Sequence, residues 1–179
     1  MAHIIIVNGP AESGKNTFCS LCRDHAYFYD MLIAQISSVD IIKEVARQLG
    51  WNGEKDEKSR KFLSDLKDLS MQYSDAPMEY LTREYNGIKD HENVMLFMHI
   101  REPEEIQRAK EHFDALTLLI KRPGYEPIQS NHADRDVDQY DYDYTIVNNG
   151  TLAELDRQAD DFIKKVKGGY FEKRREKVK

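Results

Sequence analysis

The sequence predicts one α/β domain, in which a sheet is covered by helices on both of its faces. Five short apolar segments alternate along the chain with segments of helical periodicity. The length of 179 residues fits one domain and leaves no room for a second full one. Because 40% of the residues are hydrophobic, there is enough apolar side chain for a buried core. In such a sheet, we expect a ligand at the carboxyl ends of the strands.

The first half of the chain opens with a β-branched run that Gly9 and Pro10 interrupt, which is typical of a strand buried on both faces. A later segment repeats its apolar residues at spacings of one, three, three and four, as an amphipathic helix does. The expected elements are a strand over His3–Asn8, a helix over Lys15–Ala26, a strand over Met31–Ile36, a helix that Ser37 and Ser38 with Asp40 can cap and that continues through about Leu49, a helix over Glu57–Tyr73 and a short helix from Pro77.

In the second half, Pro103 lies in the first turn of an expected helix whose early acidic residues favour the helix dipole. A segment rich in Pro, Gly, Asn and Asp has no sustained period, and we expect it to be polar and mobile. The expected elements are strands over Val94–Ile100, Leu116–Ile120 and Tyr144–Val147, a helix from Pro103 to Phe113, the polar segment Lys121–Asp141 and a closing helix from Leu152 to Val166.

The charge balance narrows the possible partners. With 26 basic and 32 acidic side chains the net charge is −6, which argues against a polynucleotide-binding surface but permits a small anion. The apolar runs fall far short of the roughly 20 residues that span a bilayer. The N-terminus lacks the features of a signal peptide, so we expect a cytoplasmic protein without membrane contact. We expect Cys19 and Cys22 to share a helix face rather than to form a redox pair or half of a zinc site.

A glycine-rich segment directly follows the first strand. Residues 9–15 match the phosphate-loop pattern G-x-x-x-x-G-K, with Gly9, Gly14 and Lys15 at its fixed positions. The glycines let backbone N–H groups and a helix N-terminus point at one anion, and Lys15 adds a positive charge. We expect the loop to bind a nucleoside triphosphate through Gly9, Ala11, Glu12, Ser13, Gly14, Lys15, Asn16 and Thr17.

The position after the lysine departs from the usual loop, because Asn16 replaces the Ser or Thr that normally ligates magnesium. The resulting G-K-x-T pattern resembles nucleoside monophosphate kinases of the adenylate kinase type. In that family G-K-G-T is usual, and magnesium is held mostly through water and phosphates. The resemblance implies ATP and Mg²⁺ as cofactors, with Thr17 as a weak or water-mediated metal ligand.

Three further segments resemble the phage-type deoxynucleoside monophosphate kinases and their uncharacterised bacterial relatives. Ser37–Lys43 is similar to their S-x-x-D-x-x-K helix, Gly50–Arg60 to their G-W-x-G-x-K-D-x-x-x-R segment, and Asp143–Leu152 to their final strand and turn. The resemblance implies a three-layer P-loop NTPase fold with a five-stranded parallel sheet of order 2-3-1-4-5. It also implies an acceptor-binding helical insertion over about 37–92 and a short lid over about 122–142.

The third strand of those kinases usually ends in D-x-R, and here the matching residues are His99 to Arg101. The arginine of the pattern is kept but its aspartate is missing. Either Glu102 or Glu105 therefore replaces the aspartate, or the metal is held without a carboxylate at the strand end. For Arg101 the alternative is a structural ion pair with an acid of the next helix. For His99 the alternative is a partly buried histidine bonded to a backbone group.

Phosphoryl transfer requires the protein to align two substrates and to neutralise the charge of the moving group. Each arginine considered for these roles could instead be an exposed surface charge, and Asp40 and Lys43 could instead form an i,i+3 surface pair. The resemblance implies catalytic roles for Lys15, Arg101, Arg122 and Arg135, and acceptor binding by Ser37, Asp40, Lys43, Arg60 and Arg101.

Together, these observations predict an enzyme that moves the γ-phosphoryl group of ATP to a small acceptor, with a deoxynucleoside monophosphate favoured, acting as a monomer or homodimer. Kinases of dephospho-coenzyme A, shikimate or gluconate share the same plan, so these acceptors stay open. Asn16 and His99 leave open a nucleotide-binding sensor without turnover. A third interpretation is an interaction protein that uses the basic tail Glu172–Lys179.

Overall fold

The computed structural model describes residues 1–124, 137 and 140–169. The chain divides into two compact units, one made of Met1–Gln35 with Asp90–Lys179 and the other of Ile36–Lys89. Most of the predicted lid, including Arg135, and the basic tail lie outside the described residues. Among the described helices, none has the length and apolar character needed to cross a bilayer.

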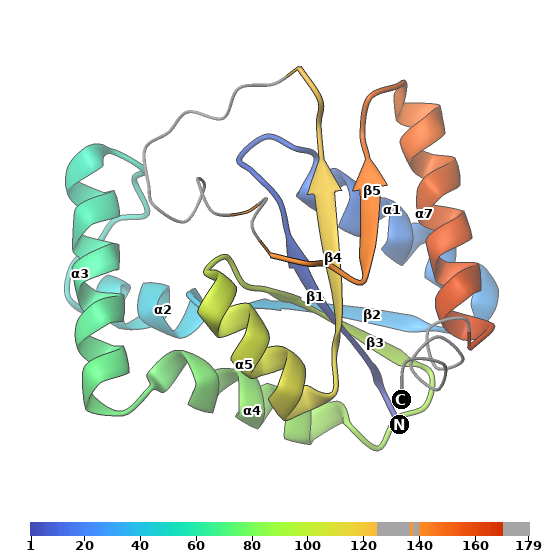
Figure 1. The fold of residues 1–179 in the computed structure, drawn as a ribbon. Helices are drawn as coiled ribbons and strands as arrows, with labels where there is room; N and C mark the ends of the chain where they lie inside the picture. Colours follow the sequence, from blue (N-terminus) through green and yellow to red (C-terminus); the bar gives the residue numbers. More distant parts are fainter. Residues whose placement is uncertain (125–136, 138–139, 170–179) are drawn as a thin grey trace. The chain divides into compact units, whose positions relative to one another are not determined.

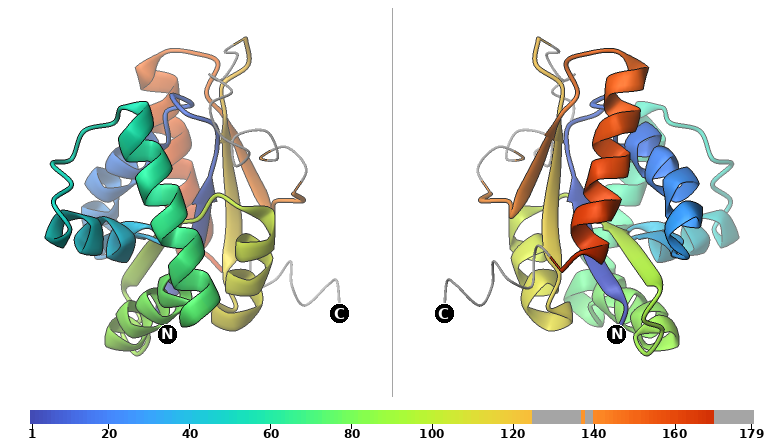
Figure 2. Two further views of the ribbon diagram at one scale, coloured as in Figure 1. Left: turned by 90° about the vertical axis from the view of Figure 1, so that its left-hand side faces the viewer. Right: turned by 90° about the vertical axis from the view of Figure 1, so that its right-hand side faces the viewer.

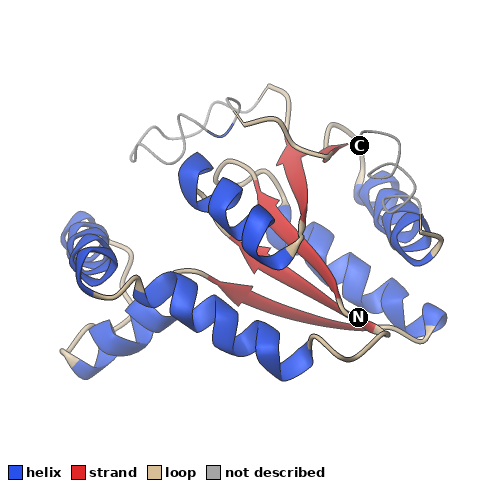
Figure 3. Cartoon of the chain, turned by 60° about the horizontal axis from the view of Figure 1, so that its bottom comes forward, coloured by secondary structure: helices blue, strands red, loops and turns tan. Residues whose placement is uncertain are grey.

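The sheet has the predicted order, β2-β3-β1-β4-β5. In the register, Val7 of β1 lies opposite His99 of β3 and Leu118 of β4, while Lys121 of β4 lies opposite Val147 of β5. The strand arrows therefore point the same way, and their carboxyl ends meet at one edge (Figure 3). The strands are β1 (His3–Asn8), β2 (Leu32–Ser37), β3 (Val94–His99), β4 (Leu116–Lys121) and β5 (Tyr144–Val147).

Both faces of the central strands are buried. Helices α1 (Lys15–Ala26) and α7 (Leu152–Lys167) lie side by side over one face, and α5 (Pro103–Phe113) lies over the other (Figures 1 and 2). This arrangement explains why β1 and β3 are apolar without alternation, because neither face of either strand meets water. The predicted three-layer α/β fold is confirmed.

Helix α1 carries the phosphate loop at its N-terminus and packs against α7 from its first turn onward. Phe18 of α1 meets Phe162 of α7 edge to face, with ring centroids 5.8 Å apart. Cys19 and Cys22 share a face of α1, as predicted, and the structure shows that both are fully buried. Burial raises the pKa of the Cys19 thiol to about 12, a perturbation that the charge of Lys15 only partly offsets, and so disfavours a reactive thiolate.

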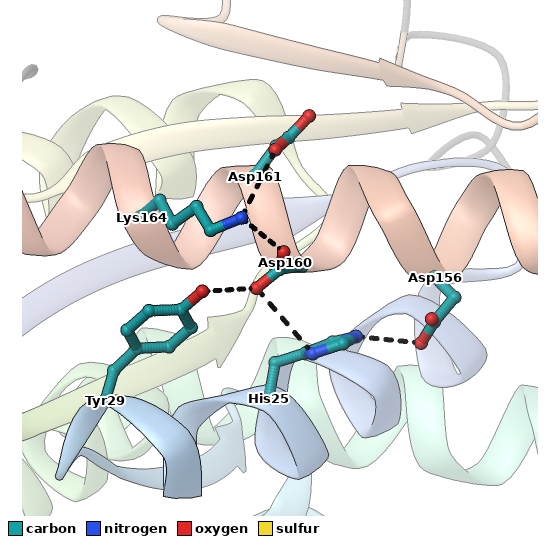
Figure 4. A network of polar contacts seen from close by, with 6 residues as sticks. All are labelled: His25, Tyr29, Asp156, Asp160, Asp161 and Lys164. Carbon is teal, nitrogen blue, oxygen red and sulfur yellow. Dashed lines mark hydrogen bonds and ion pairs between the residues drawn. The ribbon is translucent and has the colours of Figure 1, made fainter.

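A polar network at the far end of α1 adds to this packing (Figure 4). His25 Nε2 lies 2.8 Å from Asp156 Oδ1 of α7, and the hydroxyl of Tyr29 donates to Asp160 Oδ1 at 2.6 Å. Lys164 donates to the other carboxylate oxygen of Asp160 at 2.6 Å. Since Tyr29 belongs to the short helix η1 (Tyr27–Tyr29), the network joins α1 and η1 to α7 and helps to fix the axis of α1.

The unit Ile36–Lys89 consists mainly of the helices α2 (Asp40–Gln48), α3 (Glu57–Tyr73) and α4 (Ala76–Ile88), each of which contacts the other two. Asp56 begins α3 by accepting a hydrogen bond from the Ser59 amide at 2.7 Å.

Two features of this unit differ from the sequence-based expectation. Helix α4 extends over 13 residues and is not short, since Leu81 gives it a buried face. Leu69 and Tyr73, which belong to the predicted apolar stripe of α3, are 63% and 91% exposed. The stripe is therefore buried only in part.

Candidate functional site

The phosphate loop leaves the carboxyl end of β1 through backbone conformations that side chains tolerate poorly. Gly9 has φ +150°, and a Cβ there would lie 2.3 Å from the carbonyl oxygen of Ile120 in β4. Gly14 has φ +94°, and Glu12 between them also has a positive φ, 59°. The pattern G-x-x-x-x-G-K is therefore needed physically, because the loop curls tightly against the end of the neighbouring strand.

Lys15 is the first residue of α1, and its ammonium folds back over the loop. Its Nζ donates to the carbonyl oxygen of Gly9 and, at 2.7 Å, to that of Pro10. The N-cap of α1 is Gly14, which has no side chain to cap the first turn. The helix N-terminus and the lysine charge are therefore both at the loop, as an anion site requires.

The hydroxyl of Ser13 lies in the same loop. Ser13 is 1% exposed, and within the described part of the chain its Oγ has no hydrogen-bond partner. A Cβ at Gly9 would lie 2.9 Å from this Oγ, so the hydroxyl faces Gly9 across the loop. A buried hydroxyl without a partner is unfavourable unless a ligand supplies one.

Asn8, which the sequence marks only as the end of the first strand, holds the start of the loop. The residue is 1% exposed, and its Oδ1 accepts a hydrogen bond from the Gly9 amide at 2.8 Å. Its Nδ2 donates to the Arg101 carbonyl oxygen at 3.0 Å and to the Tyr142 hydroxyl at 2.8 Å. One side chain thereby ties together the ends of β1 and β3 and the segment that precedes β5.

Asn148, which sequence reasoning treated only as part of a turn, holds the other side of the loop. Its Nδ2 donates to the Ser13 carbonyl oxygen at 3.0 Å, and its backbone amide donates to the Lys121 carbonyl oxygen at 2.7 Å. The sequence does contain a signal for both residues. Asn8 ends a β-branched strand and Asn148 directly follows one, and both strands end at the expected ligand edge.

The residues after β3 and β4 reach the same edge of the sheet. Arg101 is exposed just beyond β3, and Arg122 is exposed just beyond β4. His99 is half-buried, with its Nε2 3.3 Å from Oε1 of Gln35 in β2. His99 therefore contacts a polar side chain of the neighbouring strand. Glu105, one of the two acids expected to replace the missing aspartate, is buried in the first turn of α5.

Four of the five predicted acceptor-binding residues belong to the helical unit, and three of these interact with one another. The Ser37 amide donates to Asp40 Oδ2 at 2.8 Å, and Lys43 donates to Asp40 Oδ1 at 3.2 Å. The i,i+3 surface pair that the sequence left open is thus present. Arg60 is exposed on α3. A role for these residues in acceptor binding stays a prediction.

The side chains next to the loop fit magnesium only weakly. In the described part of the chain, no group of three or more His, Cys, Asp or Glu residues could hold a metal ion. Asn16 and Thr17 are exposed in the first turn of α1. Since Mg²⁺ commonly keeps its waters and binds substrate phosphates with one or two protein ligands, the Thr17 hydroxyl, beside the Asn16 amide oxygen, is a sufficient candidate ligand in this turn.

Neither family models nor curated protein sequences match this chain. Solved structures do match it over most of its length. The crystal structure of TT1252 from Thermus thermophilus has a TM-score of 0.54 and 17% identity, and the match covers 90% of this chain and 96% of that one. At this identity the similarity shows a shared fold.

Two kinases give weaker structural matches. A gluconokinase from Sinorhizobium meliloti 1021 has a TM-score of 0.48 and 12% identity, with 95% of this chain and 97% of that chain covered. A shikimate kinase from Bacteroides thetaiotaomicron has a TM-score of 0.43 and 13% identity, with 90% and 98% covered. Similarities this distant do not bear on which acceptor this chain uses.

Proposed function

We propose that this protein transfers the γ-phosphoryl group of ATP to a small acceptor, with a deoxynucleoside monophosphate favoured. The observation that carries the proposal is the loop between β1 and α1. In this loop a G-x-x-x-x-G-K sequence, a helix N-terminus and the Lys15 ammonium meet at the carboxyl edge of a parallel sheet.

Phosphoryl transfer requires the protein to align the two substrates and to neutralise charge, because the transferred phosphoryl group passes through a loose transition state with charge on its oxygens. The loop amides would hold the β-phosphate, and Lys15 would bridge the β- and γ-phosphates. Arg101 and Arg122 at the same edge would neutralise the developing charge, together with Arg135. When bound, magnesium would screen the phosphates, with the Thr17 hydroxyl as the candidate protein ligand.

The choice of acceptor depends on sequence resemblance. Ser37–Lys43 and Gly50–Arg60 resemble the acceptor side of phage-type deoxynucleoside monophosphate kinases. Asp40 and Lys43 would contact the sugar and the phosphate of the acceptor, and Arg60 would contact its phosphate. The local pairing of Asp40 with Lys43 is compatible with this role, since exposed ion pairs are weak and exchange readily for ligand contacts.

The experiment is an ADP-release assay with ATP, Mg²⁺ and a panel of acceptors: the four common deoxynucleoside monophosphates, dephospho-coenzyme A, shikimate and gluconate. We expect one deoxynucleoside monophosphate to raise ADP release at least tenfold over the acceptor-free rate. The Lys15→Ala variant is the control for contaminating kinases. A protein that binds ATP but shows no acceptor-dependent release would be a nucleotide-binding sensor and would contradict the proposal.

A further inference from the structure

The turn after β5 touches the phosphate loop through one side chain. Asn148 donates from Nδ2 to the carbonyl oxygen of Ser13 at 3.0 Å. These two residues are 135 positions apart in the sequence. The contact therefore links the β5–α7 turn to the last part of the loop before Lys15.

The hydrogen bond from Asn148 fixes the orientation of the whole Ser13–Gly14 peptide unit and not only of the oxygen that accepts it. The Ser13–Gly14 peptide unit is planar and trans, so its C=O and N–H groups point in opposite directions. With the oxygen held toward Asn148, the Gly14 N–H must point away from Asn148. This N–H belongs to the group of amides that the phosphate-loop pattern aims at an anion.

The approach is close enough to explain why residue 14 is a glycine. A Cβ at Gly14 would lie 2.4 Å from Nδ2 of Asn148, well inside van der Waals contact. The positive φ of 94° at Gly14 independently disfavours a side chain. The glycine thus permits both the backbone turn and the asparagine that braces it.

Asn148 is itself held in place by the backbone around it. The Asn148 amide donates to the Lys121 carbonyl oxygen at the end of β4. Shortly after it, α7 begins with a capping box, in which Thr151 and Glu154 each bond the backbone amide of the other. Asn148 is thus attached to the sheet on one side and precedes a well-capped helix on the other.

We propose that Asn148 is a positioning residue of the phosphate site, which holds the Ser13–Gly14 peptide so that the Gly14 N–H donates to bound phosphate. This inference rests on the proposed function only in requiring that the loop binds phosphate. Preorganised amides avoid the cost of reorienting when the charged ligand arrives, so losing the brace weakens phosphate binding without touching the ligand.

The test compares Asn148→Ala with Asn149→Ala, its exposed neighbour in the same turn. Affinities for ATP and for inorganic tripolyphosphate are measured by calorimetry well below the melting temperature of each variant. Loss of one neutral hydrogen bond predicts roughly tenfold weaker binding of both probes by Asn148→Ala. Asn149→Ala is expected to bind both within twofold of the parent.

Tripolyphosphate makes the test specific, since it has neither base nor sugar. Equal loss for both probes supports action through the loop, whereas a loss confined to ATP would make Asn148 a nucleoside contact and overturn the proposal. Unchanged affinities with a lowered melting temperature would assign Asn148 to stability alone and would also overturn it. If Asn148→Ala does not fold, Asn148→Ser replaces it, and failure of both to fold again assigns Asn148 to stability.

The outcomes separate this inference from the proposed function. If the parent and Asn148→Ala bind both probes with equal affinity, only the positioning role of Asn148 is overturned. If the parent binds both probes but releases no ADP with any acceptor, phosphoryl transfer is refuted. A tenfold loss of affinity in Asn148→Ala would then still support the positioning role of Asn148. A parent that binds neither probe refutes both.

Discussion

The phosphate loop and the helical unit Ile36–Lys89 hold their polar side chains in different ways. Around the loop the hydrogen bonds span the chain, since Asn8 and Arg101 are 93 positions apart and Asn148 and Ser13 are 135 apart. In the helical unit, the bonds of the predicted site residues join close neighbours. The Asp40 carboxylate, for example, bonds partners three positions away on each side.

This difference has an energetic consequence. Long-range bonds among half-buried or buried groups hold several chain segments in one geometry, so the loop is organised before a ligand binds. Local pairs on an exposed helix contribute a few tenths of a kcal/mol and rearrange easily. Substitutions at the loop should therefore have large effects, and equivalent substitutions in the helical unit should have small ones.

The largest effect is expected for Lys15→Ala. Removing the charge that faces the transferring phosphoryl group should lower the turnover number at least a hundredfold, or about 3 kcal/mol of barrier. The loss of two hydrogen bonds to loop carbonyls should lower the free energy of unfolding by only about 1 kcal/mol. ADP release and a melting curve measure the two effects. The matched control is Lys61→Ala, whose ammonium pairs locally with Asp65, and a Lys15→Ala turnover within threefold of the parent would contradict the loop's assignment.

Asp143→Asn should have the next largest effect, on stability. The Asp143 carboxylate accepts from the Thr117 amide at 2.9 Å and from Lys110 at 3.0 Å, and so joins α5, β4 and the start of β5. Losing charge-assisted bonds predicts a decrease of about 2 kcal/mol in the free energy of unfolding at pH 7, measured in urea. Asp40→Asn is the matched control from the helical unit. Equal losses for the two variants would contradict the distinction between long-range and local bonds.

The same carboxylate predicts a pH dependence. Burial alone would raise the pKa of Asp143, but the bonds from Lys110 and Thr117 outweigh burial and lower it below the usual range. A lowered folded-state pKa contributes stability that is present above the unfolded value, about 4, and is lost as the pH falls through the folded value. The stability difference between the parent and Asp143→Asn should therefore shrink steadily below pH 4. A difference that stays constant down to pH 2 would contradict this.

A smaller stability effect is expected for Asp40→Asn, about 0.5 kcal/mol, because its pair with Lys43 is partly exposed. If Asp40 binds the acceptor, the KM for the acceptor should rise while the KM for ATP stays unchanged. Kinetics at varied concentrations of each substrate separate the two constants. Equal KM values for the acceptor in the parent and Asp40→Asn would remove Asp40 from the acceptor site.

The smallest effect is expected for Asn16→Gly. Asn16 is exposed, and if magnesium is held mainly by ATP and water, turnover should stay within about threefold of the parent, or roughly 0.7 kcal/mol. The measurement is ADP release over a range of Mg²⁺ concentrations. A loss beyond a hundredfold would make Asn16 a direct ligand of the reacting group.

The sequence by itself determined the elements and the phosphate loop. The strand Tyr144–Val147 and the helices Lys15–Ala26 and Glu57–Tyr73 have the predicted bounds, because apolar period and capping are local properties of the chain. The loop was recognisable for the same reason, since its glycines and lysine lie within seven residues. The sheet order followed from resemblance to a family and not from the periodicity.

Only the tertiary structure decided which residues hold the loop in place. Nothing within a few positions of Asn8 or Asn148 indicates that one bonds the Arg101 carbonyl and the other the Ser13 carbonyl. The exposure of Leu69 and Tyr73 likewise depended on what α3 packs against. The physical reason is that such contacts depend on how crossovers bring distant strand ends to one edge, which no local pattern encodes.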